Sequence, residues 1–361
     1  MSPSYRVSVI ESITGMAEMA KPWNDLLLES RSNSIFLTWE WLYTWSECFL
    51  EPDRRLFILL VHKDDELIGV APWCIRRSRS YGLPMKKVEF LGVPETGSDY
   101  LDVFAKRGKE KEVARQIYRH LQSAKSRWDA LALQDIPADS LFLLHFLNQA
   151  DEDGKYAELH PGPYSPSVSL PATVEAFMAQ LSPNRRQQFL RHHRILKRSG
   201  EVTHRVRPAE EIGPALKEFC RIYERRWGGS EGLFRFLEKF ISRSAGEPRI
   251  RFDMLSVNGR DIAGLVHLRY GPTLSMYLMG VDHSFDKSIS IGNILVGLSI
   301  EKGIVDGFSR YDFLRGDEDY KFHWSNDGKR AVHLYLYGRK AAPLSWAAGR
   351  FVKAIAKILI R

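Results

Sequence analysis

The segment YDFLRGDEDYKFHWS, residues 311–325, brings together side chains that can move protons and stabilise negative charge. Asp317 and Asp319 can each accept a proton, Tyr320 can donate one, and Lys321 can stabilise a developing negative charge. Two interpretations remain open. Either these side chains form a reaction centre, or the acids pair with the neighbouring basic residues in a structural ion network.

The charge of the chain is concentrated in two basic patches. The net charge is +8, yet residues 328–361 hold eight Lys and Arg and no acid, so residues 1–327 sum to zero. Within that part, residues 183–207 carry eight Lys and Arg against the single acid Glu201, which leaves −7 on the rest. This distribution argues against a general nucleic-acid binder, in which basic charge is spread over one whole face.

The composition is typical of a globular protein whose cysteines stay reduced. Apolar residues make up 44% of the 361 residues. Cys48, Cys74 and Cys220 are widely spaced and lack a CxxC or Cys/His pattern, so we expect neither a disulfide framework nor a metal site. The N-terminal segment has no apolar core typical of a signal peptide, and no apolar run reaches about 18 residues. We therefore expect a cytoplasmic protein.

Two stretches of the chain resemble each other. Residues 55–77 and 249–271 both indicate a strand, a polar turn and a second strand that contains a glycine. Asn258-Gly259 is a strong signal for a two-residue hairpin turn. Helical segments precede both stretches, including 34–49 with Thr38 as the expected N-cap. Further predicted strands lie at 86–92, 99–105, 129–136, 274–281 and 310–314, and further helices at 109–124, 173–181, 184–198, 209–227, 231–245 and 291–306.

The Pro-, Gly- and Ser-rich segment 160–167 is the expected domain boundary. It divides the chain into an N-terminal domain, 1–163, and a C-terminal domain, 164–342. Residues 343–361 are expected to form a separate basic amphipathic helix.

The order of these elements is similar to the layout of GNAT acyltransferases, and three local motifs sharpen the resemblance. FLTWEWLYTW (36–45), SPNRRQQFLRHHRILKRSGEV (182–202) and YDFLRGDEDYKFHW (311–324) resemble motifs of the CelD/BcsL-type acetyltransferases, a family associated with cellulose and exopolysaccharide synthesis. The FemABX transferases, which carry two GNAT-like units in tandem, are related in fold. The resemblance implies an α/β (α+β) fold of two tandem GNAT-like units, each a mixed, mostly antiparallel sheet flanked by helices.

The resemblance also implies roles for site residues. In an N-acyl transfer, Asp317 or Asp319 would act as the base, Tyr320 as the acid and Lys321 as the electrostatic stabiliser, with Arg315 and Trp324 beside the substrate. Acetyl-CoA or another acyl-CoA would be the co-substrate, and no metal is expected. The segment DKSISIGNIL (286–295) corresponds to the loop that holds the CoA diphosphate in GNAT enzymes, although it lacks the second glycine. Its expected donor-binding residues are Lys287, Ser288, Ser290, Gly292 and Asn293.

Three further features have two interpretations each. The basic helix 184–198, with Arg185 and Arg186, is either a solvated face or a site for a polyanion such as a CoA, nucleotide-sugar or lipid-linked sugar phosphate. Trp41 either belongs to the core or lines a groove where a sugar stacks. Asp99 either anchors a sugar hydroxyl or amine or caps a turn.

The tail 343–361 separates apolar from basic residues. This pattern is typical of a helix at the inner face of the cytoplasmic membrane, and equally of a helix docked on the core of the protein.

Together these features predict an acyl-CoA-dependent N- or O-acyltransferase acting on a sugar or on an envelope or exopolysaccharide precursor. The alternatives are a FemABX-like transferase that uses aminoacyl-tRNA, the one case in which a nucleic acid would be a partner, and a scaffold without activity.

Overall fold

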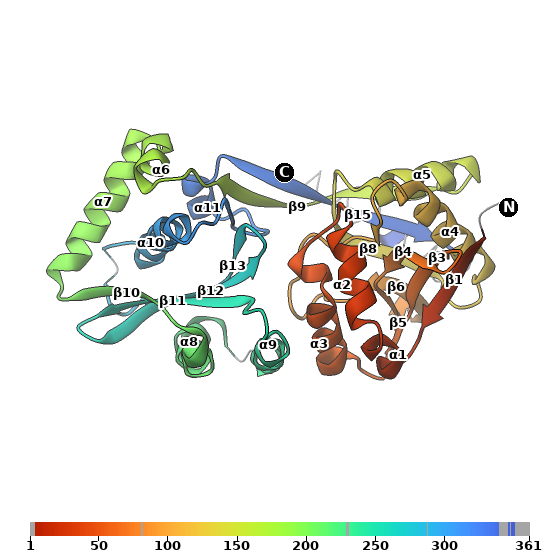
Figure 1. Cartoon of the computed structure of the whole chain (residues 1–361), viewed down its shortest axis with the longest axis horizontal. Helices are drawn as coiled ribbons and strands as arrows, with labels where there is room; N and C mark the ends of the chain where they lie inside the picture. Colours follow the sequence, from red (N-terminus) through yellow and green to blue (C-terminus); the bar gives the residue numbers. More distant parts are fainter. Residues whose placement is uncertain are drawn as a thin grey trace. The chain divides into compact units, whose positions relative to one another are not determined.

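The structure is a computed structural model that describes residues 4–80, 82–228, 231–286, 288–338, 346 and 348–350. The chain forms two compact units: residues 1–162 and 330–361 make unit 1, and residues 163–329 make unit 2. Two strands, β9 (Ala157–Ser169) and β15 (Asp327–Tyr337), run from one unit into the other (Figure 1). Lys287 and most of the predicted tail helix, 343–361, lie outside the described residues.

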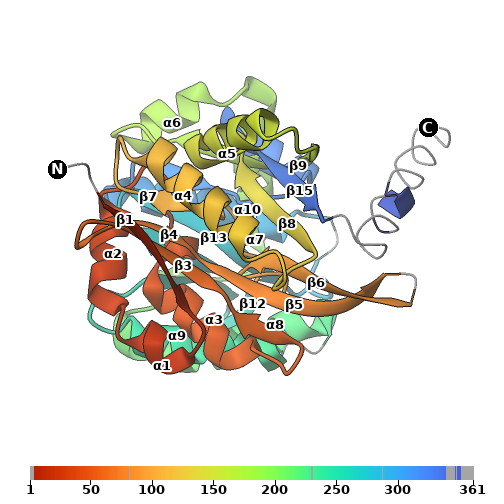
Figure 2. The ribbon, with the colours of Figure 1, turned by 90° about the vertical axis from the view of Figure 1, so that its right-hand side faces the viewer.

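Unit 1 contains two sheets with helices on both sides (Figure 2). One sheet has the order β1-β3-β4-β7, and in the other β15, β8, β6, β5 and β2 are successive neighbours. Helix α4 packs closely on β4, since a Cβ on Gly69 would lie 2.6 Å from Val113 Cγ2. The elements are β1 (Tyr5–Ile10), α1 (Ile13–Ala17), α2 (Ala20–Leu28), η1 (Ile35–Leu37), α3 (Trp39–Phe49), β2 (Arg54–Leu56), β3 (Ile58–Lys63), β4 (Glu66–Ala71), β5 (Trp73–Ser80), β6 (Leu83–Phe90), β7 (Phe104–Ala105), α4 (Glu110–Ser123), β8 (Ala130–Pro137) and α5 (Leu141–Glu152).

The aromatic helix α3 belongs to the core of unit 1. Thr38 caps it as predicted, because its hydroxyl accepts a hydrogen bond from the Trp41 backbone N–H at 3.4 Å. Trp41 and Trp45 are both completely buried, and Trp41 Nε1 donates to Ser98 Oγ at 2.8 Å. The prediction that Trp41 lines a sugar groove is therefore wrong, since its ring has no exposed face for a ligand.

The predicted strand 99–105 is mostly a structured loop that ends in the two-residue strand β7. Tyr100 has a positive φ of 54°, which breaks the extended conformation. Asp99 is buried. Its burial favours a structural role such as capping a turn over a site that is open to a sugar. Asp102 is also buried and accepts hydrogen bonds from Ser32 Oγ at 2.7 Å, Ser140 Oγ at 2.9 Å and the Val103 N–H at 2.8 Å. This carboxylate ties together three separate segments of unit 1.

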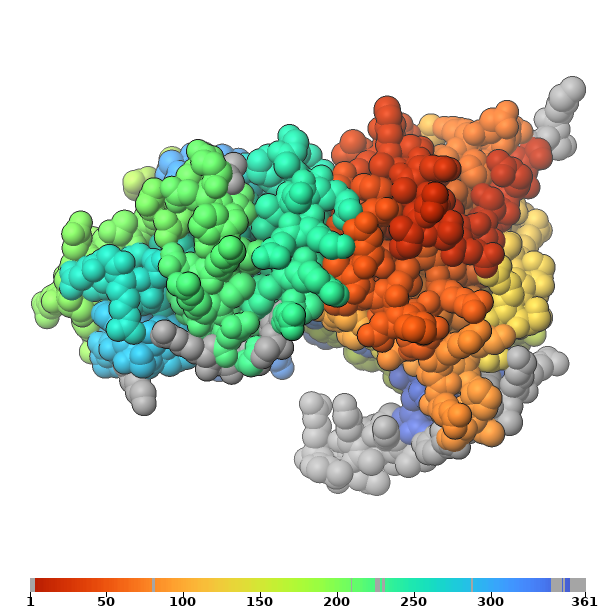
Figure 3. Space-filling view, turned by 90° about the horizontal axis from the view of Figure 1, so that it is seen from below, coloured from red at the N-terminus to blue at the C-terminus, as the bar shows by residue number. Residues whose placement is uncertain are grey.

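Unit 2 is a sheet with the order β10-β11-β12-β13-β14-β9, covered by helices on both faces. Glycines at 264 and 280 let α8 approach one face, where Phe219 packs within 3.4 Å of the Cβ that either would carry. Helices α8 and α9 form the outer surface on that side, and α10 covers the opposite face (Figures 1 and 3). The elements are α6 (Val174–Gln180), α7 (Pro183–Arg198), β10 (Val202–Val206), η2 (Ala209–Glu211), α8 (Ile212–Trp227), α9 (Glu231–Arg243), β11 (Ile250–Val257), β12 (Arg260–Tyr270), β13 (Thr273–Val281), α10 (Ile291–Val305), β14 (Arg310–Asp312) and α11 (Asp319–Trp324).

The two predicted hairpins, β3–β4 and β11–β12, share one irregularity. Each has a two-residue turn, and the second turn is Asn258-Gly259 with φ of 50° and 76°. In each hairpin the register shifts at the third residue of the second strand, Ile68 or Ile262. A bulge at the same place in both hairpins supports the prediction that the chain repeats one α/β unit.

The segment 160–167, where the domain boundary was predicted, is the middle of strand β9. Proline lacks only the backbone donor, so its carbonyl can still pair. Pro166 O accepts from the Phe313 N–H at 2.9 Å, and Tyr164 O accepts from the Gly316 N–H at 3.0 Å. A Cβ on Gly162 would lie 2.9 Å from the Ala331 carbonyl carbon, so close approach of the backbone requires glycine there.

A chain of buried polar side chains joins the sheet of unit 2 to α10. Arg251 donates two hydrogen bonds of 2.7 Å to the Asp253 carboxylate. Asp253 Oδ1 lies 2.8 Å from His204 Nε2, and Oδ2 lies 3.1 Å from His267 Nδ1. His267 Nε2 in turn contacts the Tyr311 hydroxyl at 2.8 Å, which lies 2.9 Å from a serine hydroxyl on α10. Burial alone would raise the pKa of Asp253, but these hydrogen bonds and the neighbouring positive charge hold it well below its usual range.

Two glycines of α10 should respond in opposite ways to substitution by alanine. A Cβ on Gly297 would lie 2.8 Å from Phe189 Cζ and 2.8 Å from Trp324 Cη2, whereas at Gly303 the nearest atom would be 3.5 Å away. We expect Gly297→Ala to lower the free energy of unfolding by about 1–3 kcal/mol through overpacking. Gly303→Ala should raise it by up to about 1 kcal/mol, because alanine favours the helix. Urea denaturation measures both, and equal effects at the two positions would contradict this account of the α7–α10–α11 contact.

Candidate active site

The first turn of α10 presents backbone N–H groups without helical partners. The first intrahelical bond runs from the Ile294 N–H to Ser290 O at 3.1 Å, so the amides just before it are left for other acceptors. Ser290, a predicted donor-binding residue, occupies the N-cap position. Its side chain makes no capping bond, and its N–H lies 3.4 Å from His192 Nδ1 on α7. The positive end of the helix dipole favours an anion at this place.

Two other donor-loop predictions have clear structural positions. A Cβ on Gly292 would lie 3.1 Å from Met279 Sδ, so glycine lets α10 begin close against β13. Ser288 directs both its hydroxyl and its N–H to the Asp286 carboxylate, at 2.7 and 2.8 Å. These hydrogen bonds lower the pKa of Asp286. The loop therefore carries an ionised carboxylate, and the Ser288 donors are already engaged.

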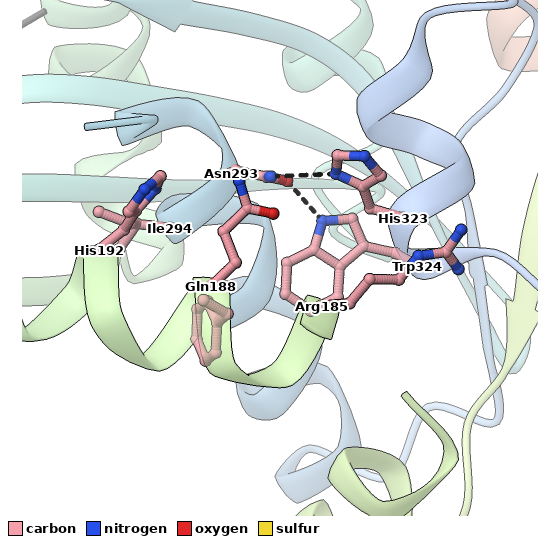
Figure 4. A pocket seen from close by; sticks show the side chains of 8 residues that line it. Arg185, Gln188, His192, Asn293, Ile294, His323 and Trp324 are labelled. Carbon is pink, nitrogen blue, oxygen red and sulfur yellow. Dashed lines mark hydrogen bonds between the residues drawn. The ribbon is translucent and has the colours of Figure 1, made fainter. Parts of the chain in front are cut away.

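A pocket lies between α7, α10 and α11, beside this helix start (Figure 4). Trp324 Nε1 donates to Asn293 Oδ1 at 2.7 Å, and Asn293 Nδ2 lies 3.5 Å from His323 Nδ1. Because indole N–H is only a donor, the Asn293 amide oxygen must accept and its NH₂ must face His323. The residues that line the pocket are Arg185, Gln188, Phe189, His192, Asn293, Ile294, His323 and Trp324.

The polar groups around this pocket are mainly hydrogen-bond donors. His323 Nδ1 faces an NH₂ group and His192 Nδ1 faces a backbone N–H, so both nitrogens act as acceptors. In each neutral ring the proton is then on Nε2. Arg185 adds a guanidinium group, and no Asp or Glu is among the lining residues. An arrangement of this kind suits an oxyanion such as a phosphate.

The loop 315–319 is fixed by Lys321 rather than open beside it. Lys321 is buried, and its ammonium group contacts Arg315 O at 2.6 Å, Leu314 O at 3.4 Å and Glu318 Oε2 at 3.0 Å. Positive φ values of 54° at Leu314 and 136° at Gly316 allow this sharp path. Since three oxygens surround its three donors, Lys321 acts in this conformation as the residue that positions the loop.

The other residues predicted for catalysis lie around this loop. Asp317 and Asp319 are exposed, whereas Arg315 is half-buried. Tyr320 packs against the hydrophobic core of unit 2. Neither aspartate is among the pocket-lining residues. The pocket therefore does not distinguish which of the two would act as the base in acyl transfer.

The pocket includes five side chains that the sequence did not predict for the site, and three of them are polar: Gln188, His192 and His323. The spacing 185, 188, 189 and 192 places four residues on one face of a helix, and this periodicity could have indicated the α7 wall. Arg186 points about 100° away from Arg185 around α7, so it does not join the pocket.

Strands β13 and β14 separate beside this region. They pair in parallel only from Thr273 and Arg310 to Ser275 and Asp312, although β13 continues to Val281. Beyond Ser275, β13 loses its neighbour on that side.

Among the described residues, no group of three or more His, Cys, Asp or Glu side chains is arranged to hold a metal ion. In the same part of the chain, no helix has the length and apolar character needed to cross a membrane.

Comparison with known proteins identifies the fold. Residues 183–322, from α7 into α11, match the family described as acetyltransferase (GNAT) domain. The crystal structure of FemX is similar, with a TM-score of 0.58 and 10% identity over 92% of this chain and 98% of FemX. A tandem GNAT protein from the clavulanic acid biosynthesis pathway gives a TM-score of 0.50 and 11% identity over 93% of this chain and all of that protein. The fold is that of a tandem GNAT protein. The predicted α/β class with two GNAT-like units is thereby confirmed.

A third neighbour in fold is the C-terminal (DUF2156) domain of a putative lysylphosphatidylglycerol synthetase from Agrobacterium fabrum. It has a TM-score of 0.54 and 10% identity over 92% of this chain and 95% of that domain. At such low identity these likenesses establish the fold and not the substrate. A search of curated protein sequences finds no significant match. The narrower resemblance to CelD/BcsL-type acetyltransferases stays a prediction.

Proposed function

We propose that this tandem GNAT protein is an acyltransferase that takes its acyl group from acetyl-CoA or another acyl-CoA and uses unit 2 for the reaction. The observation that carries the proposal is the donor-rich pocket at the start of α10, within the segment that matches the GNAT domain. Free helix amides, Arg185 and the Nε2–H groups of His192 and His323 offer positive charge and hydrogen bonds for a diphosphate.

The acceptor is proposed to be a nitrogen or oxygen nucleophile on a sugar or on an envelope or exopolysaccharide precursor. The support is the likeness of the motifs at 36–45, 182–202 and 311–324 to those of exopolysaccharide-associated acetyltransferases. In the transfer, the nucleophile adds to the thioester carbonyl, the carbon–sulfur bond breaks, and the proton lost by the nucleophile ends on the thiolate. Asp317 or Asp319 would receive the proton from the nucleophile, and Tyr320 would supply one to the sulfur. The aspartic acid would then return its proton to the tyrosinate, so that the net transfer is from the nucleophile to the thiolate. Lys321 would hold the loop that carries both aspartates.

A charge reversal in the pocket tests the donor. Arg185→Glu should weaken binding of CoA and acetyl-CoA about 10- to 100-fold, because one charged hydrogen-bond donor becomes a repelling carboxylate. Isothermal titration calorimetry on the full chain measures the dissociation constant. Arg194→Glu is the matched control, because it makes the same change on the same helix about 180° away from Arg185.

Equal loss of affinity in the Arg194 variant would show a general charge effect. The pocket would then no longer be supported as the binding site for the donor. Gly292→Trp is a poorer test, since Gly292 packs against Met279 and Val281 and a bulky side chain would disturb the core. If the unchanged protein binds neither CoA nor acetyl-CoA, the CoA-dependent function is wrong.

One observation favours a second candidate, an aminoacyl-tRNA as the donor. Asp286 places an ionised carboxylate in the loop that precedes α10, where it would repel a diphosphate. A donor without a diphosphate at this loop would avoid that repulsion. Binding of aminoacyl-tRNA with a steep decrease at higher salt, together with no binding of CoA, would favour this candidate.

A further inference from the structure

Helix α7 uses only a narrow stripe for packing. Of its 16 residues, Phe189 and Leu196 are buried. At about 100° per residue, these two lie in the same arc as Arg185 and His192, which line the pocket. The opposite arc spans about 140° and belongs to the exposed surface. We call it the outer face of α7, and its residues are Arg186, Gln187, Leu190, Arg191, Arg194, Lys197 and Arg198.

The four arginines of the outer face have no acidic partner among the described residues. Lys197 differs, because it lies near Glu301 on α10: burial raises the pKa of this carboxyl, and the charges of His204 and Lys197 partly offset that rise. Within the part of the chain that the structure describes, none of the Arg and Lys side chains of the outer face forms an ion pair, and the helix itself contains no acid. Other arginines of unit 2 do find acidic partners: Arg205 and Arg207 pair with Glu211, Arg221 with Glu218, Arg260 with Asp282 and Arg310 with Asp327. The four exposed arginines of the outer face are therefore available to an external partner.

We propose that the outer face of α7 docks the protein on an anionic lipid surface. The helix is about 24 Å long and presents its charges in one continuous stripe, which suits a plane of lipid phosphates. Leu190 stands among these charges with 45% of its surface exposed, and an apolar side chain in this position can enter the headgroup region. No aromatic side chain lies on the outer face, so the stacking platform that single-stranded nucleic acids use is missing there.

This partner goes beyond the proposed acyl transfer and does not depend on the identity of the donor. The two faces of α7 then have separate tasks. One face forms a wall of the pocket with Arg185 and His192, and the outer face meets the lipid. A substrate carried by the membrane would arrive beside the pocket, because the same helix borders both.

Vesicle co-sedimentation of the full chain tests the docking surface. The vesicles contain phosphatidylglycerol and phosphatidylcholine, with pure phosphatidylcholine as the neutral comparison. We expect binding only to the anionic vesicles, weakened by salt. The triple variant R186Q/R191Q/R194Q should bind about 100-fold more weakly, since each Lys or Arg near an anionic leaflet strengthens binding about fivefold. These side chains are exposed and unpaired, so circular dichroism should show an unchanged fold.

The matched control is K111Q/R115Q/R119Q on α4, which removes three exposed cations from another helix and changes the net charge equally. It should leave vesicle binding unchanged. Equal weakening by both triple variants would reduce the effect to net charge and overturn the proposal. So would unchanged binding of the α7 variant, or equal binding of the unchanged protein to neutral vesicles. The proposal is also overturned if tRNA releases the protein from the vesicles at a concentration lower than the lipid concentration needed for binding. The outer face would then bind nucleic acid instead of lipid.

Discussion

Asp253→Ala should lower the free energy of unfolding of this protein by about 3–5 kcal/mol, because it leaves a buried arginine without its main counter-charge. The side chains of Arg251 and Asp253 are only 4% and 0% exposed, and two hydrogen bonds of 2.7 Å join them. Alanine at 253 also removes the acceptor that His204 uses at 2.8 Å. Guanidinium chloride denaturation followed by tryptophan fluorescence measures the loss.

Two variants separate this effect from the loss of any ion pair. Asp327→Ala removes a pair whose atoms lie 3.6 Å apart and whose acid is 57% exposed, so it should cost less than about 1 kcal/mol. The double variant Arg251→Met with Asp253→Leu should recover much of the stability lost in Asp253→Ala, because it removes both charges. A similar cost for Asp253→Ala and Asp327→Ala would contradict the inference that the buried network holds unit 2 together.

This network lay beyond what the sequence could reveal. Its members come from β10, β11, β12, β14 and α10, and only the folded sheet brings them together. In contrast, Thr38 before α3, the Asn258-Gly259 turn and Pro183 at the start of α7 were predictable, since each acts on neighbouring residues of the chain. Local hydrogen bonds and fixed dihedral angles leave a signal within a few residues.

Other features of the fold were beyond prediction for the same reason. The Pro-, Gly- and Ser-rich segment 160–167 was predicted as a domain boundary, but nothing in it showed that β14 and β15 provide partners that allow β9 to pass through it as a strand. The stretch 99–105 alternates like a strand, yet its acids find donors in distant segments and it forms a loop. Periodicity describes the chain's own pattern and carries no information on which partner will satisfy a polar group.

The candidate site was predicted in part. The sequence located the start of α10 and the closing motif, because both lie in recognisable stretches. It did not bring His192 and His323 to the same pocket, since these residues lie 131 positions apart and neither forms a local motif with the other. Lys321 was predicted as a charge stabiliser, and only the three oxygens around its ammonium group reveal a positioning role.

Asp102 in unit 1 should make the stability of the protein depend on pH in an unusual direction. Burial raises the pKa of this carboxyl to about 7, and the hydrogen bonds from Ser32, Ser140 and Val103 offset only part of that shift. A carboxyl in the unfolded chain has a pKa near 3.9. Between these two values the folded state keeps a proton that the unfolded state has lost. The free energy of unfolding contributed by this group therefore falls as pH rises, by about 4 kcal/mol in total between pH 4 and pH 7, and it stays low above pH 7.

Asp102→Asn should remove this dependence, because the amide keeps similar hydrogen bonds without a titrating proton. We expect the difference in free energy of unfolding between Asp102→Asn and the unchanged protein to grow with pH up to about pH 7 and then to level off. Urea denaturation at intervals from pH 4.5 to 8.5 measures the difference, which cancels the other titrating groups. Ser32→Ala removes one hydrogen bond that stabilises the ionised carboxylate, so in this variant the fall in stability should extend to higher pH. A difference curve for Asp102→Asn that is flat with pH would show that the carboxyl is already ionised in the folded protein at acidic pH, held by its three donors despite its burial.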